Sequence, residues 1–235
     1  SIKEAPDLGV IACYGKIIKK SELEIPRLGF INVHPSLLPK YRGPSPVRTA
    51  ILNGDKVTGV TIHITRPKVD AGEILAQKEF VINGKDNYEV LEEKLFKLGA
   101  EMLAGTIENW LSGKIIPKIQ DESGATYTKI IKTDDGRINW KSDFAYILSQ
   151  IKALSPNPGV FTMFNGKRLL IIEADGEKKE SVGNPGEVIT DKNSFKISAG
   201  NGFIKPFRVK LEGKKELAAE DFLNGRQDII GTLLS

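Results

Sequence analysis

The chain has 235 residues, a hydrophobic fraction of 40%, a charged fraction of 27% and a net charge of +4 at pH 7. This composition is that of a soluble globular protein with one large domain or two ordinary ones. No apolar run approaches the ~20 residues that a membrane helix needs. The single cysteine, Cys13, excludes an internal disulfide and indicates a reducing compartment, while the thinly spread charge gives only mild support for a nucleic-acid partner.

Strand-like and helix-like patterns alternate in the first half of the chain, which predicts an α/β domain. Short apolar or alternating runs indicate strands over residues 8–13, 29–34, 58–65 and 73–80. Ser45-Pro46 is typical of a helix start, and this short helix is expected to end near Gly54. A long helix is expected to start at Asp86, with Glu89 completing a capping box, and to end at Gly113.

The second half of the chain has a different pattern. Residues 114–138 lack periodicity and predict a linker, and residues 142–154 predict one more helix. Turn pairs such as Asn165-Gly166 separate the short strands that follow, which is typical of a small β-barrel. These strands are expected over residues 160–164, 168–173, 186–190, 195–198 and 203–211. We therefore expect a catalytic α/β domain over residues 1–113, the linker, and a β-domain over residues 139–235.

Two polar side chains lie at the end of the expected strand 29–34. Asn32 and His34 are two residues apart and so share one face of that strand, where a Pro-rich loop begins. Strand ends are where α/β proteins place ligand sites. Asp70 follows the next strand and completes a candidate trio, although each residue alone also fits a turn or a structural hydrogen bond. His63 is expected to be a packing residue that at most lines the site.

Two runs of residues surround this trio, Asn32-Val33-His34-Pro35-Ser36-Leu37-Leu38-Pro39-Lys40-Tyr41-Arg42-Gly43 and Asp70-Ala71-Gly72. They resemble the 10-formyltetrahydrofolate-dependent formyltransferase superfamily, in which the matching Asn, His and Asp form the catalytic set. Thr126-Tyr127-Thr128-Lys129-Ile130, Asn157-Pro158-Gly159 and Asp221-Phe222-Leu223-Asn224-Gly225 resemble the branch that acts on a tRNA. The resemblance implies a Rossmann-like formyltransferase domain, incomplete at its N-terminus, followed by a smaller OB-like β-barrel domain that binds tRNA.

The resemblance also implies a reaction in translation initiation and one-carbon metabolism. A formyl group would pass from 10-formyltetrahydrofolate to the amino group of initiator methionyl-tRNA through a tetrahedral intermediate. Asn32 and His34 would stabilise the oxyanion, His34 could instead relay a proton, and Asp70 would orient His34 or act as a base. An Asp beside an imidazole favours the charged imidazolium. The reaction needs no metal, and two histidines with one cysteine do not form a zinc-site pattern.

Further residues take roles from the same resemblance. The expected folate-binding residues are Tyr14, Gly15, Ser36, Leu37, Leu38, Pro39 and Gly72. The expected tRNA contacts are Lys40, Arg42, Lys205, Arg208 and Lys210. We expect a monomer without membrane contact in the bacterial cytoplasm, with an organelle matrix as the other setting. Three alternatives stay open, namely a 10-formyltetrahydrofolate hydrolase, an amino-sugar formyltransferase and a non-catalytic nucleic-acid-binding module.

Overall fold

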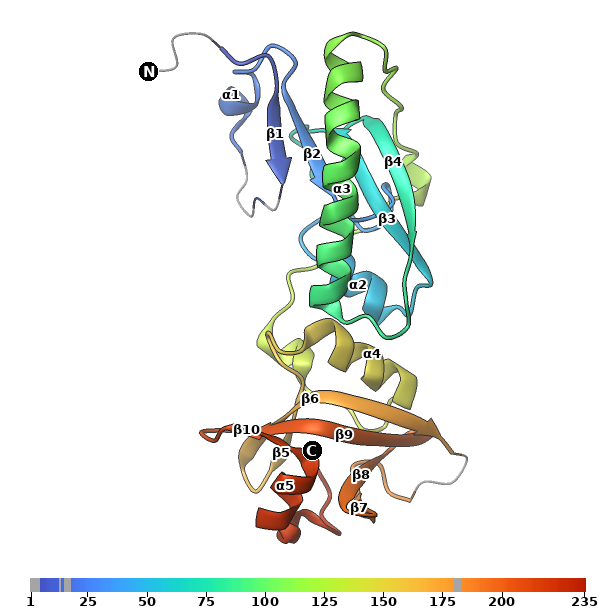
Figure 1. The fold of residues 1–235 in the computed structure, drawn as a ribbon, viewed down its shortest axis with the longest axis vertical. Coiled ribbons are helices and arrows are strands. Elements are labelled where there is room, and N and C mark those ends of the chain that lie inside the picture. The colour runs from blue at the N-terminus through green and yellow to red at the C-terminus, as the bar shows by residue number, and fades with distance from the viewer. Residues whose placement is uncertain (1–4, 13, 15–17, 180–182) are drawn as a thin grey trace. The chain divides into compact units, whose positions relative to one another are not determined.

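The computed structural model describes residues 5–12, 14, 18–179 and 183–235. They form two compact units (Figure 1). The first unit comprises the residues up to 50 together with 55–130, and the second comprises 51–54 together with 131–235. An α/β unit followed by a second unit built on its own sheet confirms the predicted fold class. The finer boundaries expected at 113 and 138 stay predictions, and Cys13 and Gly15 lie outside the described residues.

The first unit is built on a four-stranded sheet in the order β1-β2-β3-β4. Its strands are β1 (Gly9–Ala12), β2 (Phe30–His34), β3 (Val57–Ile64) and β4 (Ile74–Val81). β1 and β2 run parallel, whereas β2, β3 and β4 pair antiparallel. The short helices α1 (Lys20–Leu23) and α2 (Pro46–Leu52) lie in the connections. All four strands and α2 agree with the sequence prediction, whereas α1 was not predicted.

Helix α3 (Tyr88–Leu111) packs on this sheet through a buried stripe that includes Leu91, Leu95 and Leu98. Its N-cap is Asn87, whose side chain accepts a hydrogen bond from the Val90 amide. The capping box predicted from Asp86 is therefore wrong by one residue. Asp86 is instead buried, and both of its carboxylate oxygens accept hydrogen bonds from Lys94 Nζ at 2.8 Å.

Helix α3 approaches the sheet closely at Gly99, against the strand that carries two of the candidate site residues. A Cβ on Gly99 would lie 2.5 Å from Val33 Cγ1 and 3.4 Å from Val60 Cγ1. Val33 stands between Asn32 and His34 on β2 and points to the opposite face. The bare Gly99 backbone thus sets how closely the helix can support the strand that carries both polar side chains.

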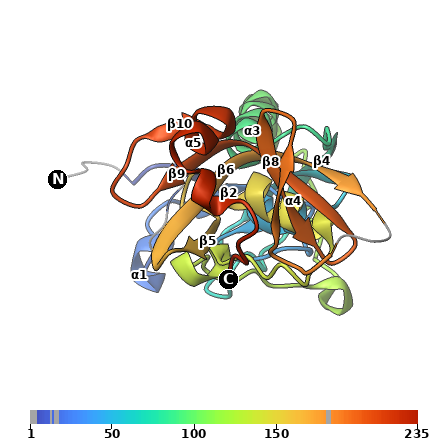
Figure 2. The same ribbon diagram turned by 90° about the horizontal axis from the view of Figure 1, so that it is seen from below.

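The second unit is a β-structure with helix α4 (Phe144–Leu154) against strands β6 and β9 (Figure 2). Its six strands are β5 (Phe161–Phe164), β6 (Lys167–Lys178), β7 (Val188–Asp191), β8 (Ser194–Ala199), β9 (Gly202–Leu211) and β10 (Glu216–Ala218). They pair antiparallel in the order β5-β6-β9-β8-β7, with β10 added to β9. The predicted helix and strands are confirmed, but closure into a barrel stays a prediction.

Short elements complete the two units. The 3-10 helices are η1 (Glu122–Gly124), η2 (Thr133–Gly136) and η3 (Gln227–Ile229), and helix α5 (Ala219–Gly225) follows β10 directly. The sequence patterns did not predict β10 or these short helices. In the part of the chain that the structure describes, no helix is both long and apolar enough to cross a membrane.

A pair of glycine substitutions on α3 tests the close packing behind the site. Gly99→Ala places its methyl group against Val33, so it should lower the free energy of unfolding by ~1–2 kcal/mol, as overpacking does. Gly105→Ala meets no atom within 4 Å, so it should raise the free energy of unfolding by up to ~1 kcal/mol through helix propensity. Urea unfolding of the two variants measures both changes. Equal stability of the variants would contradict the packing argument.

Candidate active site

The register of two strands brings the candidate residues to one face of the sheet. Asn32 on β2 stands directly opposite His63 on β3, and His34 stands opposite Thr61. Since strand side chains alternate between faces, all four share the face away from α3. The pairing of β3 with β4 shifts between Ile62 and His63, an irregularity of the kind that re-aims a side chain beside a functional site.

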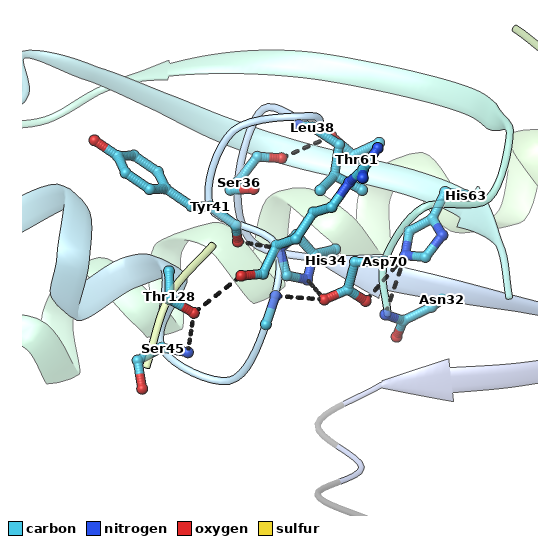
Figure 3. A network of polar contacts seen from close by, with 12 residues as sticks. Asn32, His34, Ser36, Leu38, Tyr41, Ser45, Thr61, His63, Asp70 and Thr128 are labelled. Carbon is cyan, nitrogen blue, oxygen red and sulfur yellow. Dashed lines mark hydrogen bonds and ion pairs between the residues drawn. The ribbon is translucent and has the colours of Figure 1, made fainter. Parts of the chain in front are cut away.

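Asp70, in the loop after β3, joins this cluster (Figure 3). Its Oδ2 accepts a hydrogen bond from the Gly43 amide at 2.7 Å and lies 3.6 Å from His34 Nδ1. Its Oδ1 lies 3.5 Å from His63 Nε2. The structure thus brings together the three residues predicted from the sequence and adds His63, which contacts both Asn32 and Asp70.

Backbone carbonyls determine which nitrogen of each imidazole carries a proton. His34 Nε2 lies 2.9 Å from the Tyr41 carbonyl oxygen, and His63 Nδ1 lies 2.9 Å from the Ile64 carbonyl oxygen. A carbonyl oxygen can only accept, so both of these nitrogens must be donors. The remaining nitrogens, His34 Nδ1 and His63 Nε2, face Asp70, and His63 Nε2 also accepts from Asn32 Nδ2 at 3.3 Å. Each imidazole therefore turns toward the carboxylate the nitrogen that carries no proton in the neutral ring, so a hydrogen bond to Asp70 forms only when that ring is protonated.

Burial and charge compete in setting the protonation states. Burial lowers the pKa of His34 below its ordinary 6.5, although the neighbouring Asp70 charge acts in the opposite direction. His34 is therefore neutral at pH 7, which corrects the expected imidazolium. Burial raises the pKa of Asp70, but the His63 hydrogen bond, the His34 charge and the Gly43 amide together lower it to about 2.

Polar side chains of β3 and β4 hold the loop after β2 through hydrogen bonds to its backbone. Thr61 Oγ1 donates to the Ser36 carbonyl oxygen at 2.6 Å and accepts from the Leu38 amide at 3.1 Å. Gln77 Nε2 donates to the Leu38 carbonyl oxygen at 2.9 Å. Neither Thr61 nor Gln77 was singled out from the sequence, because alternation within a strand does not reveal which loop a side chain supports.

The residues expected to bind folate differ in exposure. Ser36 and Leu38 are buried within the loop, and Gly72 is buried against β3, where a Cβ would lie 1.7 Å from the Ile64 carbonyl oxygen. Leu37 and Pro39 are half-buried, whereas Tyr14 is exposed. Their folate contacts stay predictions.

The residues expected to meet tRNA lie in three different settings. Lys40 and Lys210 are exposed. Lys205 forms an ion pair with Glu177 at 2.7 Å, and Arg208 forms one with Glu216. The Arg42 side chain has no exposed surface and binds partners inside the first unit, so a structural role replaces its expected phosphate contact.

Comparison with known proteins identifies the class of this site. A model of the formyl transferase family matches residues 2–107, and a model of the formyl transferase C-terminal domain matches residues 130–227. The chain belongs to the formyltransferase family. The methionyl-tRNA formyltransferase of Syntrophus aciditrophicus is 38% identical over 234 residues, which are 99% of this chain and 75% of that protein. The enzyme of the same name from Listeria innocua is 41% identical over 220 residues, 93% of this chain and 70% of the relative.

Solved structures show the same fold at lower identity. HypX from Aquifex aeolicus, crystallised with tetrahydrofolic acid, superimposes with a TM-score of 0.74 at 21% identity, over 96% of this chain and 40% of HypX. The N-formyltransferase from Helicobacter canadensis, solved with folinic acid and dTDP-3-aminofucose, gives a TM-score of 0.65 at 24% identity, over 82% of this chain and 71% of that enzyme. Within the residues described here, no three His, Cys, Asp or Glu side chains are grouped so that they could hold a metal ion.

The ionised state of Asp70 predicts a specific loss of stability in acid. Its folded pKa of about 2 lies below the ordinary 3.8, so ionised Asp70 stabilises the fold by roughly 2 kcal/mol above about pH 4. That contribution is lost as the pH falls to about 2. Asp70→Asn keeps an acceptor for the Gly43 amide but cannot ionise. Urea unfolding at several pH values between 4 and 2 should show a steeper loss for the wild type, and parallel curves would contradict the assignment.

Proposed function

We propose that the chain transfers a formyl group from 10-formyltetrahydrofolate to the amino group of initiator methionyl-tRNA. The observation that carries this proposal is the cluster of Asn32, His34, His63 and Asp70 in a chain about 40% identical, over nearly its whole length, to methionyl-tRNA formyltransferases. HypX and the Helicobacter canadensis enzyme were solved with folates, which supports a folate as the cosubstrate. A monomeric, cytoplasmic protein without membrane contact stays a prediction.

Asn32 supplies the neutral donor that the reaction requires. Attack of the amine on the formyl carbon converts the carbonyl oxygen into an oxyanion, which a preorganised donor stabilises. An amide NH₂ group has two N–H donors. One of them bonds His63 Nε2 at 3.3 Å, which fixes the amide plane and leaves the second for the oxyanion. Asn32 brings no charge that would compete with the attacking amine.

His34 and Asp70 supply the proton transfer. His34 is neutral, and its Nε2 is bonded to the Tyr41 carbonyl, so Nδ1 is the nitrogen that can accept a proton from the attacking amine. The imidazolium then formed lies 3.6 Å from the ionised Asp70 carboxylate, which balances its charge. The same proton passes to the folate nitrogen as its bond to the formyl carbon breaks. Assistance of this kind contributes about 10²–10⁴-fold to the rate.

The reaction can be tested by the dependence of folate release on the acceptor. The chain is incubated with 10-formyltetrahydrofolate in three reactions, with charged initiator tRNA, with a dTDP-amino sugar and with neither. We expect tetrahydrofolate and formylmethionyl-tRNA to appear together, and only in the first reaction. Equal tetrahydrofolate release in all three would indicate a hydrolase. Formylation of the sugar alone would indicate an amino-sugar formyltransferase, and no turnover in any reaction would favour a binding module.

The role of Asn32 is tested by removing its amide. Asn32→Ala should lower kcat by ~10²–10³-fold, as loss of one oxyanion donor does, with folate affinity nearly unchanged. Asn83→Ala is the matched control, since Asn83 is an exposed amide of the first unit that bonds only the Lys85 amide among the contacts described. Stopped-flow turnover and folate titration measure the two quantities. A kcat equal to that of the control would remove Asn32 from the mechanism.

A further inference from the structure

A buried arginine connects the loop after β2 to a distant segment of the same unit. The Arg42 side chain has no exposed surface. Its Nε and Nη2 donate to Gln120 Oε1 at 3.1 and 2.8 Å, and its two Nη groups donate to Glu122 at 2.9 and 3.2 Å. Nη1 also donates to the Tyr127 hydroxyl at 3.0 Å. These five bonds use all five N–H donors of a guanidinium, so Arg42 is fixed in one orientation.

Gln120 connects the fixed Arg42 side chain to the backbone of Asp70. Its oxygen is occupied by Arg42, and its Nε2 donates to the Asp70 carbonyl at 2.8 Å and to the Gly72 carbonyl at 2.7 Å. Asp70 has a φ of 48°, a left-handed conformation that residues other than glycine rarely adopt. Such a conformation persists when surrounding contacts enforce it. The buried Gln120 amide is the side chain that bonds the backbone on both sides of Ala71.

The backbone on each side of Arg42 holds the two groups that transfer the proton. The Tyr41 carbonyl accepts from His34 Nε2 at 2.9 Å, and the Gly43 amide donates to Asp70 Oδ2 at 2.7 Å. This backbone is in turn bonded to residues 126–128. The Arg42 amide donates to the Thr126 carbonyl at 2.9 Å, and the Tyr41 amide donates to Thr126 Oγ1 at 2.8 Å. Movement of residues 126–128 would therefore displace both contacts.

We infer that Gln120, together with Thr126, is a positioning residue for the formyl-transfer site. Gln120 aims the Asp70 carboxylate, and Thr126 aims His34 through the Tyr41 carbonyl. Neither side chain contacts His34 or the Asp70 carboxylate among the interactions described, so each acts through the backbone it holds. This inference builds on the proposed function, but its central claim concerns the orientation of His34 and Asp70, which can be measured without substrate.

Gln120→Glu separates positioning from packing. The substituted carboxylate has the same shape and still accepts from Arg42, but it cannot donate to the Asp70 and Gly72 carbonyls. We expect kcat for formyl transfer to fall ~10–100-fold, the range in which misplacement of reacting groups acts, with KM for both substrates within ~2-fold of the wild type. The ¹⁵N shifts of the His34 imidazole, recorded without substrate, should show loss of the single tautomer protonated on Nε2.

Thr126→Val tests the contact between Thr126 and the Tyr41 backbone. It also covers the case in which the Gln120→Glu variant fails to fold. Thr126 is exposed, so valine fits there while removing the acceptor for the Tyr41 amide. We expect the same change in His34 tautomer and a fall in kcat of several-fold. Lys68→Ala is the control, since Lys68 is exposed and bonds Glu122 at 2.6 Å without touching Gln120 or Thr126.

The outcomes distinguish failure of this inference from failure of the proposed function. The positioning role would be overturned if a folded Gln120→Glu protein kept the ¹⁵N shifts of His34 seen in the wild type. If that variant does not fold, the same result in Thr126→Val would overturn it. A drop in thermal stability with unchanged kcat and His34 tautomer would reduce Gln120 to a structural residue. If the wild type forms no formylmethionyl-tRNA while the variants still lose the His34 tautomer, the proposed function fails and the positioning role stands.

Discussion

The pairing register between β2 and β3 is the constraint on which the site depends. It places Asn32 opposite His63 and directs both toward the face that Asp70 approaches. A slip of one residue would turn Asn32 and His34 toward α3, where Val33 now packs against Gly99. The apolar packing of one face of the sheet thereby fixes the positions of the polar side chains on the other face.

In this cluster, burial and neighbouring groups have opposite effects on the pKa values of the imidazole and the carboxylate. Burial lowers the pKa of His34, whereas the Gly43 amide and the interactions with the two histidines in their protonated forms lower the pKa of Asp70 to about 2. A buried carboxylate without such partners would take up a proton, and an exposed imidazole would be partly charged near neutral pH. The arrangement gives a base and a fixed negative charge at adjacent positions, which suits proton transfer from an amine to a leaving nitrogen.

The sequence predicted the longer helices, most of the strands and the trio, but not the side chains that support the trio. Strand periodicity located β2 and β3, and the two-residue spacing of Asn32 and His34 put them on one face. His63 was expected to be packing, because a single histidine in a strand gives no sign of the side chain opposite. Gln120 was not predicted to support the site for a different reason. It lies in a stretch without periodicity, and its hydrogen-bond partners, the Gly72 and Asp70 carbonyls, are 48 and 50 residues away in the chain.

The contacts of residues 120–128 also determine when the site can form during synthesis. Asn32, His34, His63 and Asp70 leave the ribosome before residues 120–128, yet the backbone that orients two of them is bonded to Gln120 and Thr126. Domains fold as units once their whole sequence has emerged. A nascent chain from which this segment has not yet emerged therefore holds the side chains of the candidate site without these supporting contacts. The geometry of the site therefore depends on a segment that lies about 50 residues beyond Asp70 in the chain.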